Sequence, residues 1–344
     1  MKRVAALLAA ALLATGLIGC GGGGAEPGAP EGATLVLDFQ PNAVHSGIYA
    51  AQANGDFTDE GIDLHIQEPS STADSAKLLE TGRADFAVMD INDFGIARER
   101  GLDLVAIAAV VQRPLASVIA RDPNEIRTPA DLAGKTIGVT GVPSDDAVLD
   151  TVLRAGGVDP PDVHRVTIGF NAVADLAAGK VDAATAFWNA EGVTLQQQGI
   201  PIREFRVDNF GAPRYPELVV VTTPKTLDPP GPACPLYDGL SHGYGELNRD
   251  PDGALDDVLS EVPGLDRSIQ EAQLAALMQA GAFSPGLGPP FEAREGTARF
   301  DLYKQNVRAW GTWASNNQLI SDRHRVLSGF TEEGPPVSCP GPSD

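Results

Sequence analysis

Short apolar runs and helical patterns follow one another along the middle of the chain. The apolar runs predict strands at residues 35–37, 62–66, 84–89, 104–111, 117–120, 136–140, 163–168, 182–187, 202–205 and 218–222. Helical periodicity lies between most of them, at 70–81, 92–100, 144–155, 172–178 and 189–198. Strands that are separated by single helices favour an α/β fold with mostly parallel sheets.

The strand pattern fades after about residue 223. Two amphipathic helices are predicted there, at 268–280 and 296–315, and the chain ends in a Pro-rich tail at 331–344. We expect the apolar stripes of these helices to be core rather than ligand contacts. The stripes consist of Leu274, Leu277, Met278, Phe300, Tyr303, Val307 and Trp310.

Two segments of the chain resemble each other. Residues 79–87 and 176–184 both read as a helix end, a glycine, a cation and a strand with Asp at its start. We interpret this as two similar α/β lobes, with chance similarity of two common turns as the alternative. A length of 344 residues also exceeds what one hydrophobic core usually serves.

The N-terminus predicts export. Lys2 and Arg3 precede an apolar run at 4–19, which is short for a membrane span of about 20 residues and typical of a cleaved signal peptide, residues 1–19. The end of this run resembles a bacterial lipobox and predicts a lipidated Cys20 on the outer face of the cytoplasmic membrane. The alternative is a simple cleaved signal with an incidental cysteine. Residues 20–33 are Gly-rich and predict a flexible tether.

Charge and cysteine content narrow the function classes. The formal net charge of −21 argues against nucleic acid as a partner. Cys234 and Cys339 form an even pair, which in an exported protein favours a disulfide; two free thiols are the alternative. No zinc-type spacing and no catalytic motif occurs, so we expect no metal, no cofactor and no catalytic residues.

Ligand-binding side chains are predicted where the first strand passes into the first helix. Phe39 closes the strand, Asn42 is a plausible N-cap, and His45 and Tyr49 share one face of the helix. Ligands of open α/β sheets bind outside the carboxyl ends of strands. The simpler alternative for Tyr49 is a place in the core.

A second set of such residues occurs in the second half of the α/β region. Trp188, Asn189 and Glu191 follow a strand end, and Tyr215 and Glu217 precede the Val-rich strand at 218–222. An aromatic ring beside a carboxylate suits a flat heterocycle, because the ring stacks and the carboxylate accepts from an exocyclic amine. The alternatives are a core role for Trp188 and surface positions for the two glutamates.

The motif Asp38-Phe39-Gln40-Pro41-Asn42-x-x-His45-x-Gly47-x-Tyr49 resembles the opening of the thiamine-pyrimidine-precursor-binding proteins of ABC transporters. That family is related to the yeast enzyme that makes the same pyrimidine. Further stretches agree in order at 131–139, 179–183, 189–191 and 211–219. The resemblance implies a two-lobed periplasmic binding protein of type II with two crossovers. Lobe one would be 34–120 plus 222–330, and lobe two 121–221.

The resemblance also implies a function. We expect a monomeric solute-binding lipoprotein that captures a small amino-heterocycle, a thiamine pyrimidine precursor, and docks on an ABC permease with its ATPase. Phe39, with Trp188 or Tyr215, would stack on the ring, and Asp90 would reach an amine. The remaining predicted contacts come from Asn42, His45, Tyr49, Asn189, Glu191 and Glu217, with Ser144 and Asp145 on the far wall.

Different functions remain open at this point. The same fold could bind riboflavin, or an anion such as a sulfonate or nitrate. An enzyme of pyrimidine precursor synthesis is a further possibility, but the Cys-rich motif of the yeast-type enzymes is absent. The last possibility is a structural lipoprotein without a role in transport.

Overall fold

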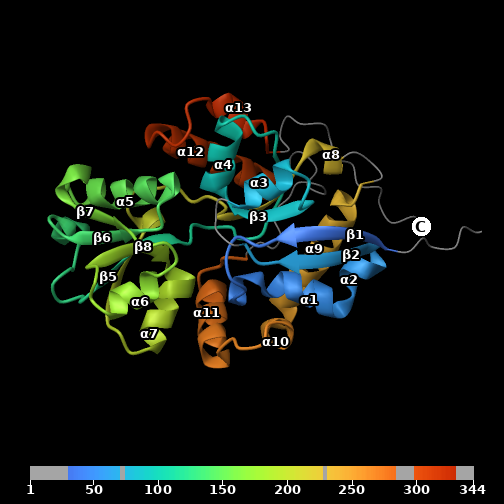
Figure 1. Ribbon diagram of the computed structural model, residues 1–344, viewed down its shortest axis with the longest axis horizontal. Helices are drawn as coiled ribbons and strands as arrows, with labels where there is room; N and C mark the ends of the chain where they lie inside the picture. Colours follow the sequence, from blue (N-terminus) through green and yellow to red (C-terminus); the bar gives the residue numbers. More distant parts are fainter. Residues whose placement is uncertain (1–29, 70–73, 228–230, 284–297, 331–344) are drawn as a thin grey trace, which may run out of the picture.

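The computed structural model describes residues 30–69, 74–227, 231–283 and 298–330. Within these ranges the chain forms two sheets that lie side by side, each flanked by helices (Figure 1). The predicted signal peptide, Cys20, the tail at 331–344 and Cys339 lie outside the described residues. These features therefore stay predictions.

Each lobe contains a five-stranded sheet in which one strand runs against the other four. The first sheet has the order β2 (Ile62–Gln67), β1 (Glu31–Val36), β3 (Phe86–Asp90), β10 (Leu218–Thr222) and β4 (Val105–Ala109). The second has the order β7 (His164–Thr167), β6 (Thr136–Val139), β8 (Ala183–Phe187), β5 (Ala116–Arg121) and β9 (Ile202–Arg206). The antiparallel members are β10 and β5. The predicted two-lobed α/β fold with mostly parallel sheets is confirmed.

The helices cover both faces of each sheet. Lobe one carries α1 (Ser46–Asn54), α2 (Asp56–Asp59), α3 (Asp74–Glu80), α4 (Ile91–Glu99), α8 (Pro224–Leu227), α9 (Ala233–Arg249), α10 (Pro251–Glu261), α11 (Arg267–Gln279), α12 (Ala298–Asn316) and α13 (Arg323–Leu327). Lobe two carries α5 (Pro143–Ala155), α6 (Ala172–Ala177), α7 (Val193–Gln197) and a π-helical turn, Trp188–Gly192. Among the described helices, none is both long and apolar enough to cross a bilayer.

The chain crosses between the lobes twice, after β4 and before β10. The strand that follows each crossing pairs with the sheet it enters: β5 with β8 and β9, and β10 with β3 and β4. The expected boundaries at 120/121 and 221/222 are therefore displaced by one strand. β5 belongs to lobe two, and β10 belongs to lobe one.

Two smaller expectations also need correction. The tether was expected to reach residue 33, but Glu31 already begins β1, where its N–H donates to Gly61 O at 2.9 Å. The helix predicted at 144–155 begins one residue earlier, because α5 starts at Pro143. The N-cap is Val142 and Pro143 takes the first helical position, which suits its fixed φ, so Ser144 lies in the first turn.

The repeated turn has the same role in both lobes. Gly82 and Gly179 end their helices with φ of 65° and 67°, where only glycine is comfortable. One carboxylate oxygen of Asp85 then accepts the N–H of Thr34 in β1 at 2.8 Å. Asp182 accepts the N–H of Thr136 in β6, also at 2.8 Å. In both lobes the aspartate thus fastens its strand to the neighbouring parallel strand.

The C-terminal helices of lobe one reach across to lobe two. α11 and α12 lie on opposite sides of the junction between the lobes (Figure 1). From α11, Gln273 Nε2 donates to Ala190 O at 3.4 Å. From α12, the Trp313 indole N–H donates to Thr151 Oγ1 at 3.2 Å. The predicted stripes of these helices are indeed buried at Leu274, Leu277, Tyr303, Val307 and Trp310, whereas Met278 is half-buried and the Phe300 side chain is not described.

The shared aspartate turn predicts equal losses of stability in the two lobes. Asp85→Ala and Asp182→Ala each leave a backbone N–H without its charged acceptor, so we expect each variant to lose about 1–3 kcal/mol of unfolding free energy. Urea unfolding measures this loss. Asp63→Ala, at an exposed position of β2, is the matched control and should change stability by less than about 0.5 kcal/mol. Losses no larger than the control's would contradict the assigned role.

Candidate functional site

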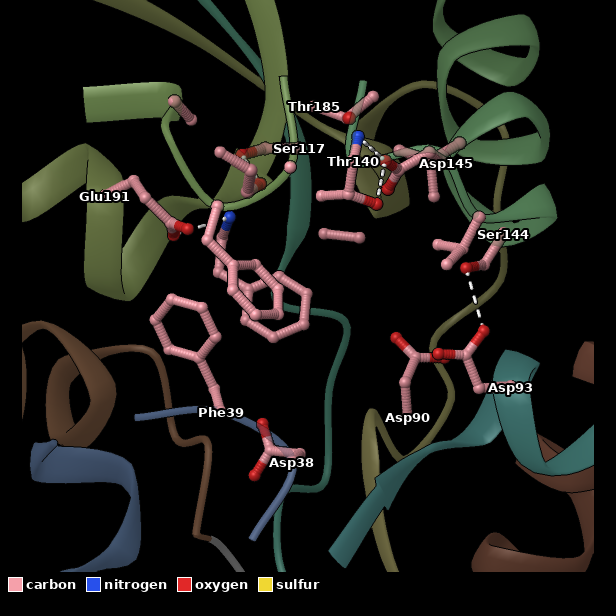
Figure 2. A pocket seen from close by; sticks show the side chains of 18 of the residues that line it. Asp38, Phe39, Asp90, Asp93, Ser117, Thr140, Ser144, Asp145, Thr185 and Glu191 are labelled. Carbon is pink, nitrogen blue, oxygen red and sulfur yellow. Dashed lines mark hydrogen bonds between the residues drawn. The ribbon is translucent and has the colours of Figure 1, made fainter. Parts of the chain in front are cut away.

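A cavity of about 100 Å³ lies between the two lobes. Its walls come from the carboxyl ends of β1, β3, β6 and β8, which face one another across the junction, and from the start of β5 (Figure 2). This is the place where ligands of such sheets bind. The cavity is therefore the candidate functional site.

Phenylalanines from both lobes form one wall. Phe39 follows β1 in lobe one, and Phe170 precedes α6 in lobe two. Their ring centroids lie 4.9 Å apart, with the planes at 88°. Phe187, at the end of β8, lines the same cavity. Phe170 is 40% exposed, and among the described residues Val166 is the other exposed large apolar residue. These rings offer flat apolar contact to a planar ligand.

Carboxyl groups form the opposite wall. Asp90 is the N-cap of α4 and accepts the N–H of Asn92 at 2.6 Å. Asp93 lies in the first turn of α4, beside Asp90, and accepts the hydroxyl of Ser144 from lobe two at 3.0 Å (Figure 2). Burial, and the nearby carboxyl of Asp90, raise the pKa of Asp93 to about 8. At neutral pH Asp93 therefore carries a proton in most ligand-free molecules.

Two more carboxyls of lobe two face the cavity. Glu191 lies in the π-helical turn, and its Oε2 accepts the N–H of Phe187 at 3.1 Å. Burial raises the pKa of Glu191 to about 7. Asp145 accepts the N–H of Thr140 and also its hydroxyl, the latter at 2.6 Å. Burial raises the pKa of Asp145 as well, against the lowering effect of these hydrogen bonds.

The ionisable side chains that line the cavity are all acidic. Its lining includes five carboxyl groups and, among the described residues that form it, no Lys, Arg or His. The carboxyls are Asp38, Asp90, Asp93, Asp145 and Glu191. Within the described residues, no three His, Cys, Asp or Glu side chains are arranged to hold a metal ion. The lining favours a ligand that donates hydrogen bonds or carries positive charge.

Five of the predicted ligand-binding residues line this cavity, and seven do not. Those that line it are Phe39, Asp90, Ser144, Asp145 and Glu191. Those that do not are Asn42, His45, Tyr49, Trp188, Asn189, Tyr215 and Glu217. Most residues of the second group make hydrogen bonds or packing contacts with other residues of the protein instead.

In lobe one, Asn42 and His45 position Asp38. Asn42 Oδ1 accepts the N–H of Val44 at 2.9 Å, and the Asn42 N–H donates to His45 Nδ1 at 3.2 Å. The imidazole proton is therefore on Nε2, which lies 2.9 Å from Asp38 Oδ1. Tyr49 faces a separate hollow on lobe one, which His65 and Glu68 also line.

In lobe two and at the crossings, the predicted aromatic residues support the backbone. The Trp188 indole N–H donates to Pro114 O at 3.0 Å, and the Arg206 guanidinium lies 4.0 Å from the ring centroid. Tyr215 stacks on Trp313, with centroids 5.7 Å apart. Trp188 and Tyr215 are fully buried, and Asn189 is buried in the π-helical turn. The two rings therefore pack inside the protein, and Asn189 Oδ1 is buried without a hydrogen-bond partner among the described residues.

Glu217 lies directly behind Asp90. It is fully buried, and its Oε2 accepts the backbone N–H groups of Leu115 and of Ala116, the latter at 3.2 Å. Glu217 precedes β10 after the second crossing, whereas Leu115 and Ala116 end the first crossing. One carboxyl therefore ties the two crossings together. Burial, and the nearby carboxyl of Glu217, raise the pKa of Asp90 well above its usual range.

The predicted ligand-binding set lacks several residues of the cavity, among them Asp38, Asp93, Phe170 and Phe187. Asp93 had a usable signal, because it lies one turn after Asp90 in a helix that leaves a strand end. The sequence signal for Phe170 was weaker. Phe170 follows Gly169 in the loop after β7, and the fold of this loop decides where its side chain points.

Comparison with known proteins agrees with this architecture. A family model described as "NMT1/THI5 like" matches residues 42–254. The formylaminopyrimidine-binding protein of Halalkalibacterium halodurans is 31% identical over 72% of this chain and 77% of its own. The 4-amino-5-hydroxymethyl-2-methylpyrimidine phosphate synthase of Legionella pneumophila is 28% identical over 47% of this chain and 51% of its own. This chain thus spans about half the length of that synthase.

A solved structure has the same fold. The alkanesulfonate-binding protein SsuA of Xanthomonas axonopodis pv. citri, bound to MOPS, superposes with a TM-score of 0.68 over 88% of this chain and 98% of its own. The sequence identity is 19%. The likeness at this identity concerns the fold alone.

The raised pKa values of Asp93 and Glu191 predict a pH effect on stability. The folded protein keeps protons on these groups up to pH about 8 and about 7, whereas the unfolded chain releases them near pH 4. Stability from these groups is therefore present at low pH and falls as the pH rises from about 5 to 8, by up to about 1.4 kcal/mol per pH unit for each proton. Urea unfolding of ligand-free protein across this range measures the slope.

The control for this slope is the doubly neutral variant Asp93→Asn with Glu191→Gln. It keeps the shapes and removes the two protons, so its unfolding free energy should fall less steeply than that of the unchanged protein. Parallel profiles for the two proteins between pH 5 and 8 would show that these carboxyls ionise normally.

The position of Glu217 predicts a sharp difference between two substitutions. Glu217→Ala leaves the N–H groups of Leu115 and Ala116 without an acceptor, so we expect a loss of about 2–5 kcal/mol. Glu217→Gln keeps an acceptor for them and its amide can donate to Asp90, so the loss should stay within about 1 kcal/mol. Denaturant unfolding distinguishes the two, with the exposed Glu125→Ala as control. Equal losses for Ala and Gln would refute the role of the carboxyl.

Proposed function

Because the chain belongs to the NMT1/THI5-like family, we propose that it is the solute-binding component of an ABC importer and captures an aminopyrimidine precursor of thiamine. The ligand would lie in the cavity between the lobes. Phe39 would stack on the ring, and Asp90, Asp145 and Glu191 would accept hydrogen bonds from its amino group and substituents.

One observation carries this proposal: phenylalanine rings and carboxyls face each other in one cavity that lacks a cation among its described lining residues. An aminopyrimidine is flat and apolar on its faces, and its edge carries N–H donors. A carboxyl that is protonated near neutral pH, as Glu191 is in part, offers a donor and an acceptor side by side. That pair complements a ring nitrogen next to an exocyclic amine.

The size of the cavity favours a single ring. A water-sized group needs about 10–15 Å³ of such space, so about 100 Å³ holds roughly seven to ten of them. A substituted pyrimidine fits this range. Riboflavin, with three fused rings and a sugar-alcohol chain, exceeds it.

Anion binding and pyrimidine synthesis are both disfavoured. Sulfonate and nitrate sites need cations or free helix N-termini, whereas this cavity offers carboxyls. Binding is favoured over synthesis because the relative that matches the larger share of the chain is named for binding a formylaminopyrimidine. The synthase relative matches about half of the chain.

Export and anchoring belong to the same proposal. A lipidated Cys20 would hold the protein at the outer face of the cytoplasmic membrane, next to the permease and its ATPase. We also propose the Cys234–Cys339 disulfide. Cys234 is disulfide-bonded in the structure, but Cys339 lies outside the described residues.

Calorimetry with purified protein tests the ligand. We expect 4-amino-5-hydroxymethyl-2-methylpyrimidine or its formylamino relative to bind, and riboflavin, taurine and nitrate not to bind. Phe39→Leu keeps the apolar volume but loses the aromatic face, so it should weaken binding about three- to tenfold. Mass spectrometry of the small molecule that copurifies identifies the ligand independently.

Phe210→Leu is the matched control, because Phe210 packs on Phe205 in the core of lobe two, away from the cavity. It should leave the affinity for the pyrimidine unchanged. Preferential binding of taurine, nitrate or riboflavin, or binding of none of the pyrimidines, would contradict the proposed ligand class.

A further inference from the structure

Three acidic side chains form a row that starts in the protein interior and ends in the cavity. Glu217 is the innermost, fully buried and anchored by the amides of Leu115 and Ala116. Asp90 comes next, and the neighbouring carboxyl of Glu217, together with burial, raises its pKa. Asp93 is the outermost and touches Ser144 across the junction. The row brings three potential negative charges to one wall.

Nothing in the described protein neutralises this row with a full charge. Glu217 Oε1 is buried and has no hydrogen-bond donor other than the carboxyl of Asp90. The guanidinium of Arg113, on the first crossing, is paired with Asp208 at 2.6 Å. Arg100, at the end of α4, is the least of the influences on Asp93. In the ligand-free protein, protons on the carboxyls take the place of a counter-charge.

The cavity end of this row faces open space: Asp90 and Asp93 line the cavity, and none of its described lining residues is a Lys, Arg or His. We propose that the Asp90–Asp93 wall binds a protonated amine carried as a substituent on the ring that the phenylalanines hold. This inference rests on the proposed function for the identity of the ring, but the charge preference of the wall can be tested apart from it. A neutral substituent would leave the carboxyl row without a counter-ion.

The ammonium group would replace the protons that the wall now holds. On binding, Asp93 gives up its proton to solvent, and the resulting carboxylate accepts a hydrogen bond from the ammonium group. The groups that face Asp93 are Asp90 on its own helix, and Ser144 and Asp145 on α5, with Arg100 further away. Behind them, Glu217 and Tyr215 lie near Asp90, and Asp208 acts on both of these residues. Only Arg100 among these opposes protonation of Asp93 by positive charge.

Two pairs of probes separate the charge from the ring. The first pair is 4-amino-5-aminomethyl-2-methylpyrimidine and its 5-hydroxymethyl counterpart, which differ only in NH₃⁺ against OH. The second is benzylamine and benzyl alcohol, which lack the pyrimidine. Calorimetry at pH 7 should show the amine binding at least about tenfold more tightly within each pair that binds.

The pH dependence of the affinity is a second measurement, and apolar packing of the ligand alone would not change it. Because free Asp93 is protonated below pH about 8, the affinity for the amine probes should rise between pH 6 and 8, by up to tenfold per unit. Titrations in buffers of different ionisation enthalpy should show proton release. Asp93→Asn should abolish both the preference and the pH slope, whereas the exposed Asp63→Asn should keep both. If Asp93→Asn does not fold, Asp90→Asn is the second variant.

The outcomes keep the two proposals apart. Equal binding of the amine and the alcohol in the pyrimidine pair overturns this inference and leaves the proposed function standing. A preference for benzylamine, with neither pyrimidine bound, supports the inference and removes the proposed function. Binding of none of the four probes overturns the charge preference as well.

Discussion

The carboxylate of Glu217 is the interaction on which the rest of the structure depends. It accepts backbone N–H groups from the first crossing while it belongs to the second, so it fixes the two strands that join the lobes. A buried carboxylate is costly unless its oxygens are occupied. Here amides occupy Oε2, and the nearby carboxyl of Asp90 lies against the buried side chain. The junction and the cavity wall therefore meet in one side chain.

That arrangement links the cavity wall to the two crossings between the lobes. Asp90 lies between Glu217 and the cavity, so any group that changes the charge of Asp90 also changes the surroundings of Glu217. The aromatic wall has no such link, since Phe39 and Phe170 touch each other edge to face across the junction. The two walls thus differ in chemistry: the phenylalanine wall offers a flat apolar surface, and the carboxyl wall offers groups whose charge can change.

The sequence predicted most of the fold because apolar runs and turn residues are local signals. It predicted Phe39, Asp90 and Glu191 at the cavity because strand ends are also local. It could not predict which way a side chain turns after a strand. His45, Trp188 and Tyr215 occupy similar positions and turn toward Asp38, the Pro114 carbonyl and Trp313. The closeness of Glu217 to Asp90 comes from the antiparallel pairing of β10 with β3, which no local pattern reveals. Helix α9 was missed because its glycines and proline mask a helical pattern.

The placement of α11 and α12 has a consequence for how fast a bound molecule could leave. Both helices belong to lobe one, yet they bond to lobe two on opposite sides of the junction, through Gln273 and Trp313. Gln273 binds the carbonyl of Ala190, next to Glu191 in the same π-helical turn. Separation of the lobes must break both contacts, neither of which touches the cavity. If a ligand leaves by separation of the lobes, its residence time depends in part on the C-terminal helices, so two such proteins with identical cavities could release the same molecule at very different rates.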